Sequence, residues 1–249
     1  MKLRLDKLLV ERRLVPSRER AQALILAGKV MVNEQKMEKS GAAVDPDVTL
    51  RLLEEDLKYV GRGGLKLEKA LDHWHIDVAG QTCLDVGAST GGFTDCLLQH
   101  GAGRVIAIDT GYGQMDFGLR QDARVRLLEK TNARYLTRAA LGEYASLIAM
   151  DVSFISATLV LPAVISSAFP LAKDRTSVCR AVILVKPQFE AGRAEVGKGG
   201  IVRNQAVQLA AVERVRQAVV QLGAQETDSI DSPILGAEGN REFLLHAQF

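Results

Sequence analysis

The sequence predicts an α/β fold, with a mostly parallel sheet covered by helices on both faces, preceded by a small α+β domain. From Thr82 onward, short apolar runs alternate with helical or loop segments. The first 55 or so residues carry a separate, basic pattern of helices and short strands. A length of 249 residues, 47% of them hydrophobic and 25% charged, suffices for one sizeable core and a small appendage.

The N-terminal region has its own predicted elements. Residues 4–13 predict a short helix with leucines on one face. Ser17 is a plausible N-cap for a second helix, which Gly28 would end in the left-handed conformation. An extended stretch with a turn at Asn33 follows, and residues 48–53 predict a closing strand.

The larger region begins after a polar linker, residues 54–64, so we place the domains at 1–60 and 61–249. Parallel strands are predicted at TCLDVG, RVIAIDT, ASLIAMD and AVILVKP. AAVERVRQAVVQLG predicts an amphipathic helix, and the final run, FLLHAQF, predicts an antiparallel strand inserted late.

Charge and cysteine usage narrow the class of protein. The chain has a net charge of +2, but residues 1–30 hold eight Lys/Arg against three acidic residues, which favours contact with a polyanion over a merely solvated surface. Cys83, Cys96 and Cys179 show no metal or disulfide spacing, and His73, Trp74 and His75 lack ligand partners. The charged start and the lack of an apolar run of about 20 residues lead us to expect a cytoplasmic protein without metal or membrane span.

A glycine turn predicts a nucleoside site. The strand holding Asp85 runs directly into Gly87, Gly91 and Gly92 and then a helix, so backbone can approach a ligand closely. Asp109 ends the next strand, where a carboxylate can accept both ribose hydroxyls. The glycine spacing is not that of the dinucleotide fingerprint, although a dinucleotide site or a structural turn remain alternatives.

Four charged residues predict a reaction centre. Asp151 and Lys186 each end a parallel strand, where ligands bind in such sheets. Lys66 lies on the helix that begins the domain and Glu242 begins the last strand. Two lysines and two carboxylates suit a poorly acidic hydroxyl, which needs a positioned base and cationic surroundings. Surface ion pairs are the alternative for each residue taken alone.

The N-terminal pattern RLDKLLVERRLVPSRERAQALILAGKVMVN resembles the S4 RNA-binding domain. Cations on adjacent helices can follow phosphates without reading bases, although Arg12 or Arg20 can instead pair with Glu11 or Glu19. The resemblance implies a basic surface for structured RNA made by Arg4, Lys7, Arg12, Arg18, Arg20 and Lys29.

The turn LDVGASTGGFTD resembles motif I of class I S-adenosylmethionine-dependent methyltransferases, which implies S-adenosylmethionine as cofactor. Asp109 would then hold the ribose, Asn132 would lie near the adenine, and Asp151 near the methyl donor. The residues implied around the methionine part are Gly87, Ala88, Ser89, Gly91, Gly92 and Phe93.

The charged set resembles the K-D-K-E tetrad of FtsJ-type ribose 2′-O-methyltransferases. The surrounding motifs are similar to those of the hemolysin-A-type rRNA cytidine 2′-O-methyltransferases, which also carry an S4 domain. These motifs are RGGLKLEKAL, DVSFIS, KPQFEAGRAEVGKGGIVR and GNREFLL. The resemblance implies a seven-stranded Rossmann-like sheet and rRNA or ribosomal subunits as partner. One departure is Leu65, where the family commonly has an aromatic or polar residue.

Roles follow from that resemblance. Lys186 would be the base or the hydroxyl-orienting group, held by Asp151, while Lys66 and Glu242 would fix the ribose. The loop from Gly192 to Arg203 would face the substrate, with Phe189 either stacked on a base or packed in the core. The main alternative is an RNA-binding assembly factor with a vestigial methyltransferase fold. A pore-forming cytolysin, suggested only by the family's name, has no support in the sequence.

Overall fold

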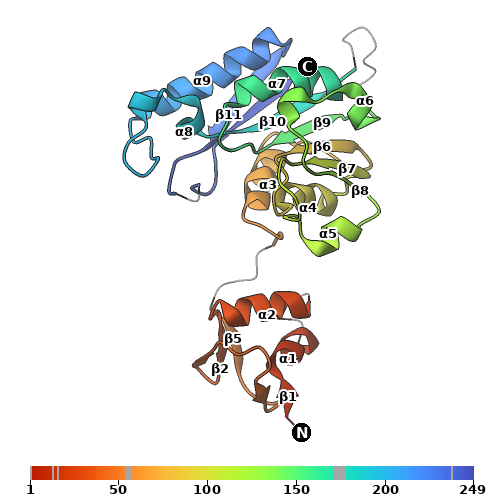
Figure 1. Cartoon of the computed structure of the whole chain (residues 1–249), viewed down its shortest axis with the longest axis vertical. Helices are drawn as coiled ribbons and strands as arrows, with labels where there is room; N and C mark the ends of the chain where they lie inside the picture. The colour runs from red at the N-terminus through yellow and green to blue at the C-terminus, as the bar shows by residue number, and fades with distance from the viewer. Residues whose placement is uncertain (1, 13, 16, 54–57, 171–177, 237) are drawn as a thin grey trace. The chain divides into compact units, whose positions relative to one another are not determined.

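The chain forms two compact units, residues 1–58 and 59–249, drawn in Figure 1. This computed structural model describes residues 2–12, 14–15, 17–53, 58–170, 178–236 and 238–249. Part of the predicted linker, residues 54–57, lies outside the described residues. Each unit has its own hydrophobic core, and each is described by itself.

The N-terminal unit packs two short helices, α1 (Leu5–Glu11) and α2 (Arg18–Leu26), on small antiparallel strands. Ser17 caps α2 by accepting the Arg20 N–H, and Gly28 follows the helix at φ +66°. Asn33, at φ 48°, makes the predicted turn. The strands are β1 (Leu3–Arg4), β2 (Val30–Val32), β3 (Gln35–Met37), β4 (Ala43–Val44) and β5 (Leu50–Leu52), in sheets ordered β1-β4 and β3-β2-β5.

The C-terminal unit is built on a seven-stranded sheet ordered β11-β12-β10-β9-β6-β7-β8. All its pairings are parallel except those of β12, which runs antiparallel to both β10 and β11. This confirms the predicted α/β class and the late antiparallel strand. The strands are β6 (Thr82–Val86), β7 (Arg104–Ile108), β8 (Val125–Leu128), β9 (Leu147–Met150), β10 (Arg180–Val185), β11 (Glu226–Asp231) and β12 (Phe243–Gln248).

Helices cover both faces of this sheet (Figure 1). Side chains of α3, α4 and α5 pack with Cys83 and Val105 on one face, and those of α6, α7 and α9 pack with Leu84 and Ile106 on the other. Successive strand residues point to opposite faces, so near-continuous apolar strands are buried on both. The helices are α3 (Gly63–His73), α4 (Gly92–Gln99), α5 (Phe117–Gln121), α6 (Arg138–Leu141), α7 (Ala157–Ala168), α8 (Pro187–Glu190) and α9 (Gln205–Gln221).

The sheet places the site at its carboxyl edge. The adjacent central strands β6, β9 and β10 end at Val86, Met150 and Val185. The next residues along the chain are Gly87, Asp151 and Lys186, so parallel pairing brings all three to one edge. Among the described residues, no helix has the length and apolar character needed to cross a membrane.

Candidate active site

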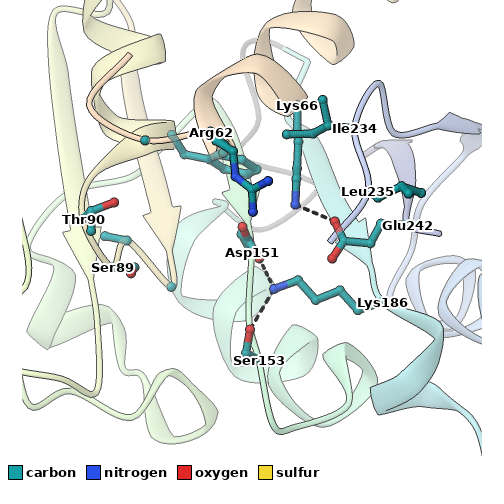
Figure 2. A pocket seen from close by; sticks show the side chains of 16 residues that line it. Arg62, Lys66, Ser89, Thr90, Asp151, Ser153, Lys186, Ile234, Leu235 and Glu242 are labelled. Atoms are coloured by element: carbon teal, nitrogen blue, oxygen red, sulfur yellow. Dashed lines mark hydrogen bonds and ion pairs between the residues drawn. The ribbon is translucent and has the colours of Figure 1, made fainter. Parts of the chain in front are cut away.

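Two ion pairs meet in one pocket of about 340 Å³ (Figure 2). Lys186 Nζ lies 2.5 Å from Asp151 Oδ1, and Lys66 Nζ lies 2.5 Å from Glu242 Oε2. The four residues predicted as a reaction centre therefore converge, although Lys66 and Glu242 are 176 positions apart. Figure 2 shows the two lysine side chains reaching the pocket from different elements.

The Lys66–Glu242 pair is buried: Lys66 is 8% exposed and Glu242 is 3% exposed. Lys66 comes from the first turn of α3, and Glu242 immediately precedes β12. Desolvating two charges is costly, and removing one partner leaves an unpaired buried charge. The pair thus ties the helix that begins the unit to its last strand at the pocket wall.

Lys186 is held on two sides. Its Nζ donates to Ser153 Oγ at 2.7 Å and contacts the Asp151 carboxylate. Both partners come from the segment after β9, while Lys186 immediately follows β10. The ammonium therefore makes one hydrogen bond, to Ser153, and one ion pair, to Asp151, at the point where Lys186 lines the pocket.

The glycine turn lies against the same pocket. Gly87 has φ +89°, and a Cβ placed there would lie 2.2 Å from the Asp151 carbonyl oxygen, so only glycine fits. Gly91, at φ +99°, is the N-cap of α4. Of the predicted methionine-binding residues, those that line the pocket are Gly87, Ala88, Ser89, Gly92 and Phe93.

A second pocket of about 310 Å³ adjoins the first and shares Gly87, Ser89, Asp151 and Ser153 with it. Both volumes fall in the range of small-molecule sites, roughly 300–1,000 Å³. Asp109 and Asn132, predicted near ribose and adenine, line this second pocket.

Asp109 is oriented by backbone. Its carboxylate accepts the Ser89 N–H at 2.7 Å and the Gly111 N–H at 2.6 Å. A carboxylate has about four acceptor positions, so both oxygens can still accept from ribose hydroxyls. The narrow glycine turn and this oriented carboxylate fit a nucleoside carrying an extended substituent.

Asp85 supports the turn from beneath. It is fully buried, and Thr94 donates its hydroxyl to Asp85 Oδ2 at 2.6 Å. Within the described part of the chain Oδ1 has no hydrogen-bond partner. Burial, together with the nearby carboxylates of Asp151 and Asp109, raises the pKa of Asp85 to about 7.

Several residues of the site were not predicted from the sequence. Arg62 points into the first pocket from the start of α3 (Figure 2), and a signal was available, since it stands four positions before Lys66 in a glycine-rich stretch. Phe154 is 91% exposed, has φ 65° and lines the second pocket. Also missed as lining residues were Thr90, Ser153, Ile234 and Leu235.

Phe189, predicted either to stack on a base or to lie in the core, is half-buried on α8, and its ring centroid lies 5.3 Å from that of Phe154. The loop after it is anchored by Asn240, which accepts the Val202 N–H and donates to the Gly200 carbonyl. Trp74 stacks on His246 and donates its indole N–H to Asp228.

The predicted RNA-binding residues of the N-terminal unit differ in their surroundings. Arg4 and Arg18 both contact buried Asp6, whose pKa the Arg4 guanidinium holds well below its usual range. Arg12 donates to the Val48 and Pro46 carbonyls, so it braces the unit's own fold. Lys7 is exposed, and Arg20 and Lys29 are each half-buried.

Fold and site together define a class I methyltransferase-type domain with a separate small RNA-binding-type domain. Residues 59–249 match the FtsJ-like methyltransferase family, and residues 3–50 match the S4 domain. The chain belongs to the TlyA, or hemolysin A, family, as the resemblance predicted.

Relatives match over nearly the whole chain. The "Putative rRNA methyltransferase YqxC" of Bacillus subtilis is 47% identical, over 98% of this chain and 85% of the relative. The 16S/23S rRNA (cytidine-2′-O)-methyltransferase TlyA of Mycobacterium tuberculosis is 43% identical, over 97% and 88%. A solved "Putative hemolysin" from Streptococcus thermophilus is 41% identical, with a TM-score of 0.72 over 99% of this chain and 88% of that structure.

Proposed function

We propose that this protein transfers a methyl group from S-adenosylmethionine to the 2′-hydroxyl of a cytidine ribose in ribosomal RNA. The observation that carries the proposal is the meeting of Lys66, Asp151, Lys186 and Glu242 beside the glycine turn. Family membership adds the substrate class, because a 43% identical relative is an rRNA cytidine-2′-O-methyltransferase.

The cofactor would span the two adjoining pockets. Asp109 would accept the ribose hydroxyls and Asn132 would lie beside the adenine, while the turn from Gly87 to Phe93 would surround the methionine part. When bound, S-adenosylmethionine supplies an electrophilic sulfonium methyl. The chain's own task is then to align the sugar oxygen with that carbon.

Lys186 would contact the target hydroxyl. In support of this role, Nζ is held by an ion pair with Asp151 and a hydrogen bond to Ser153, and Lys186 lines the first pocket. As an ammonium, Lys186 stabilises negative charge as it develops on the sugar oxygen, and the hydroxyl proton then leaves to solvent. Only a neutral Lys186 amine could accept that proton itself. The buried Lys66–Glu242 pair would hold the ribose against this group.

The S4 unit would supply affinity for structured rRNA. Arg4 and Arg18, organised by Asp6, together with Lys7, present cations from β1 and two neighbouring helices. Contacts of this kind are made to phosphates and do not by themselves select a sequence. The choice of cytidine would thus lie with the pocket residues, Phe154 among them.

Purified ribosomal subunits and labelled S-adenosylmethionine test the proposal. Wild-type protein is expected to transfer label to rRNA, and Lys186→Ala is expected to lose transfer by at least about 100-fold while still binding cofactor in calorimetry. Failure of wild-type protein to label either subunit would end the proposal. Failure to bind the cofactor at all would favour an assembly factor with a vestigial fold.

A further inference from the structure

Two segments that follow the neighbouring strands β9 and β10 contact each other at several successive positions. We call residues 151–156, after β9, the Asp151 loop, and residues 186–190, after β10, the Lys186 turn. At one end of the contact Lys186 meets Asp151 and Ser153, and next along the chain Phe189 meets Phe154. The far end, which lines neither pocket, is closed by Glu190.

Glu190 makes this closure with both carboxylate oxygens. Oε2 accepts the Ser156 hydroxyl at 2.5 Å, and Oε1 accepts the Ala157 N–H at 2.7 Å. Ser156 is the N-cap of α7, so the carboxylate lies at the N-terminus of a 12-residue helix. The Arg214 guanidinium donates to the Glu190 carbonyl, which fixes the turn to α9.

Burying the Glu190 carboxylate is energetically unfavourable. Glu190 is 4% exposed, and burial raises its pKa above the usual value. Ser156 already caps α7 by accepting the Thr158 N–H, so the helix has a cap without Glu190. The extra contact therefore joins two segments in addition to capping the start of α7.

The backbone conformation of the Asp151 loop requires stabilising contacts on both sides of Phe154. Phe154 has φ 65°, a conformation that a bulky non-glycine residue adopts only when its surroundings impose it. On one side the Asp151 N–H donates to the Val86 carbonyl at 2.8 Å. Within the loop Val152 and Ile155 pack against the core, and at its far end Ser156 and the adjoining Ala157 are hydrogen-bonded by Glu190.

We propose that Glu190 is a positioning residue for methyl transfer: it locks the Asp151 loop onto the Lys186 turn, so that Asp151 and Ser153 meet Lys186 Nζ. The inference rests on the proposed function for its catalytic meaning. The structural part of the inference is that the contacts of Lys186 depend on Glu190. This part holds whatever the substrate is.

Glu190→Ala and Glu190→Gln in the full-length protein test this. The glutamine amide can still accept the Ala157 N–H and can donate to Ser156, so it should rescue part of the effect. We expect kcat on ribosomal subunits to fall on the order of 10- to 100-fold in Glu190→Ala and less in Glu190→Gln, since small misplacements of reacting groups are costly. The KM for the subunits should change less than kcat.

A matched control removes a helix cap elsewhere. Asn204 caps α9 by accepting the Ala206 N–H at 2.9 Å and lines neither pocket. Asn204→Ala should lower the Tm without lowering kcat. A Glu190 series that behaves like this control, with lower Tm and unchanged kcat, would overturn the proposal.

Amine labelling of Lys186, followed by mass spectrometry with Lys7 as internal reference, gives a readout free of substrate. Release of Lys186 from Asp151 and Ser153 should raise its labelling rate several-fold in Glu190→Ala, and less in Glu190→Gln. An unchanged labelling rate would overturn the proposal whatever kcat does. If wild-type protein labels no rRNA, the proposed function fails, and the Lys186 labelling alone decides the inference.

Discussion

At the scale of single residues, the site is made of charges that are expensive to bury and are therefore matched in pairs. Lys66 with Glu242 and Lys186 with Asp151 each place an ammonium 2.5 Å from a carboxylate. Asp85, also buried, has a hydroxyl partner on one oxygen only, and its pKa is raised to about 7. The paired and the unpaired carboxylates should respond differently to substitution and to pH.

Breaking the buried pair should cost stability as well as activity. Lys66→Met leaves the Glu242 carboxylate buried and unpaired, which should lower the free energy of unfolding by about 3–5 kcal/mol. Adding Glu242→Gln should restore much of that stability but no activity. The control is Arg241→Gln, which breaks the more exposed Arg241–Asp231 pair and should cost less than about 1 kcal/mol. Denaturant titration measures all four proteins, and equal losses in both pairs would contradict the expectation.

Asp85 should make stability depend on pH. Between about pH 4 and 7 the folded state keeps a proton on Asp85 that the unfolded chain has released, so stability falls as pH rises through this window. Each tenfold change in proton affinity is worth about 1.4 kcal/mol, which bounds the loss at roughly 4 kcal/mol. Unfolding at pH 5 and pH 8 should show a smaller loss for Asp85→Asn than for wild type. Parallel changes in both proteins would rule this out.

At the scale of elements, turns and strand ends place the chemistry. Gly87 passes so close to the Asp151 carbonyl that the turn after β6 and the loop after β9 share one wall. A turn of this kind is rigid because its neighbours leave no room for another conformation. The shape of both pockets therefore depends on glycine at position 87.

A pair of alanine substitutions separates backbone strain from crowding. Gly87 and Gly80 both have positive φ, but a Cβ on Gly80 meets nothing within 4 Å. Gly80→Ala should cost about 1–2 kcal/mol of stability and leave cofactor affinity unchanged. Gly87→Ala should weaken S-adenosylmethionine binding by at least about 10-fold in calorimetry. Equal affinities in the two variants would show that the turn does not shape the site.

At the scale of the whole molecule, the chain consists of two units, each with its own hydrophobic core, and we propose that the first binds RNA and the second carries out the reaction. The S4 unit carries Lys7 and the Asp6-organised arginines, and the larger unit carries both pockets. The binding of the N-terminal cations to RNA should be electrostatic and sensitive to salt.

Lys7, in α1, and Arg12, the C-cap of α1, should differ in role: Lys7 should bind RNA, whereas Arg12 should stabilise the fold of the S4 unit. Lys7→Gln should weaken binding to ribosomal subunits and reduce the slope of log affinity against log salt by about 1, with no change in Tm. Arg12→Gln loses its bonds to the Val48 and Pro46 carbonyls, so it should lower the stability of the S4 unit. Filter binding over a salt series, with thermal unfolding beside it, checks both; an unchanged salt slope in Lys7→Gln would contradict the RNA-facing role.

Much of this architecture was predictable because its signals are local. Asp151 and Lys186 could be placed together since parallel strands end at one edge, and Ser17 and Gly28 mark the ends of α2 by their own chemistry. The ion pair of Lys66 with Glu242 is a different case: it joins residues 176 apart, and the family resemblance implied only that both would fix the ribose.

What escaped prediction depends on tertiary contacts. The four-residue α8 ends at Glu190, whose carboxylate accepts from Ser156 and Ala157, and Phe154 has a left-handed φ; nothing in the sequence singles out either feature. Helix α7 contains Pro162, a residue that usually ends a helix. Arg62 lies within the motif that contains Lys66, four positions before it, but that spacing alone does not show which way its side chain points.

The most direct test of the central claim is a map of rRNA 2′-O-methylation in cells lacking this protein, complemented with wild type or with Lys186→Ala. Modification at one or more cytidines should be absent without the protein, return with wild type and stay absent with the variant. Identical maps in all strains, or restoration by Lys186→Ala, would contradict the claim that this protein methylates ribose by means of Lys66, Asp151, Lys186 and Glu242.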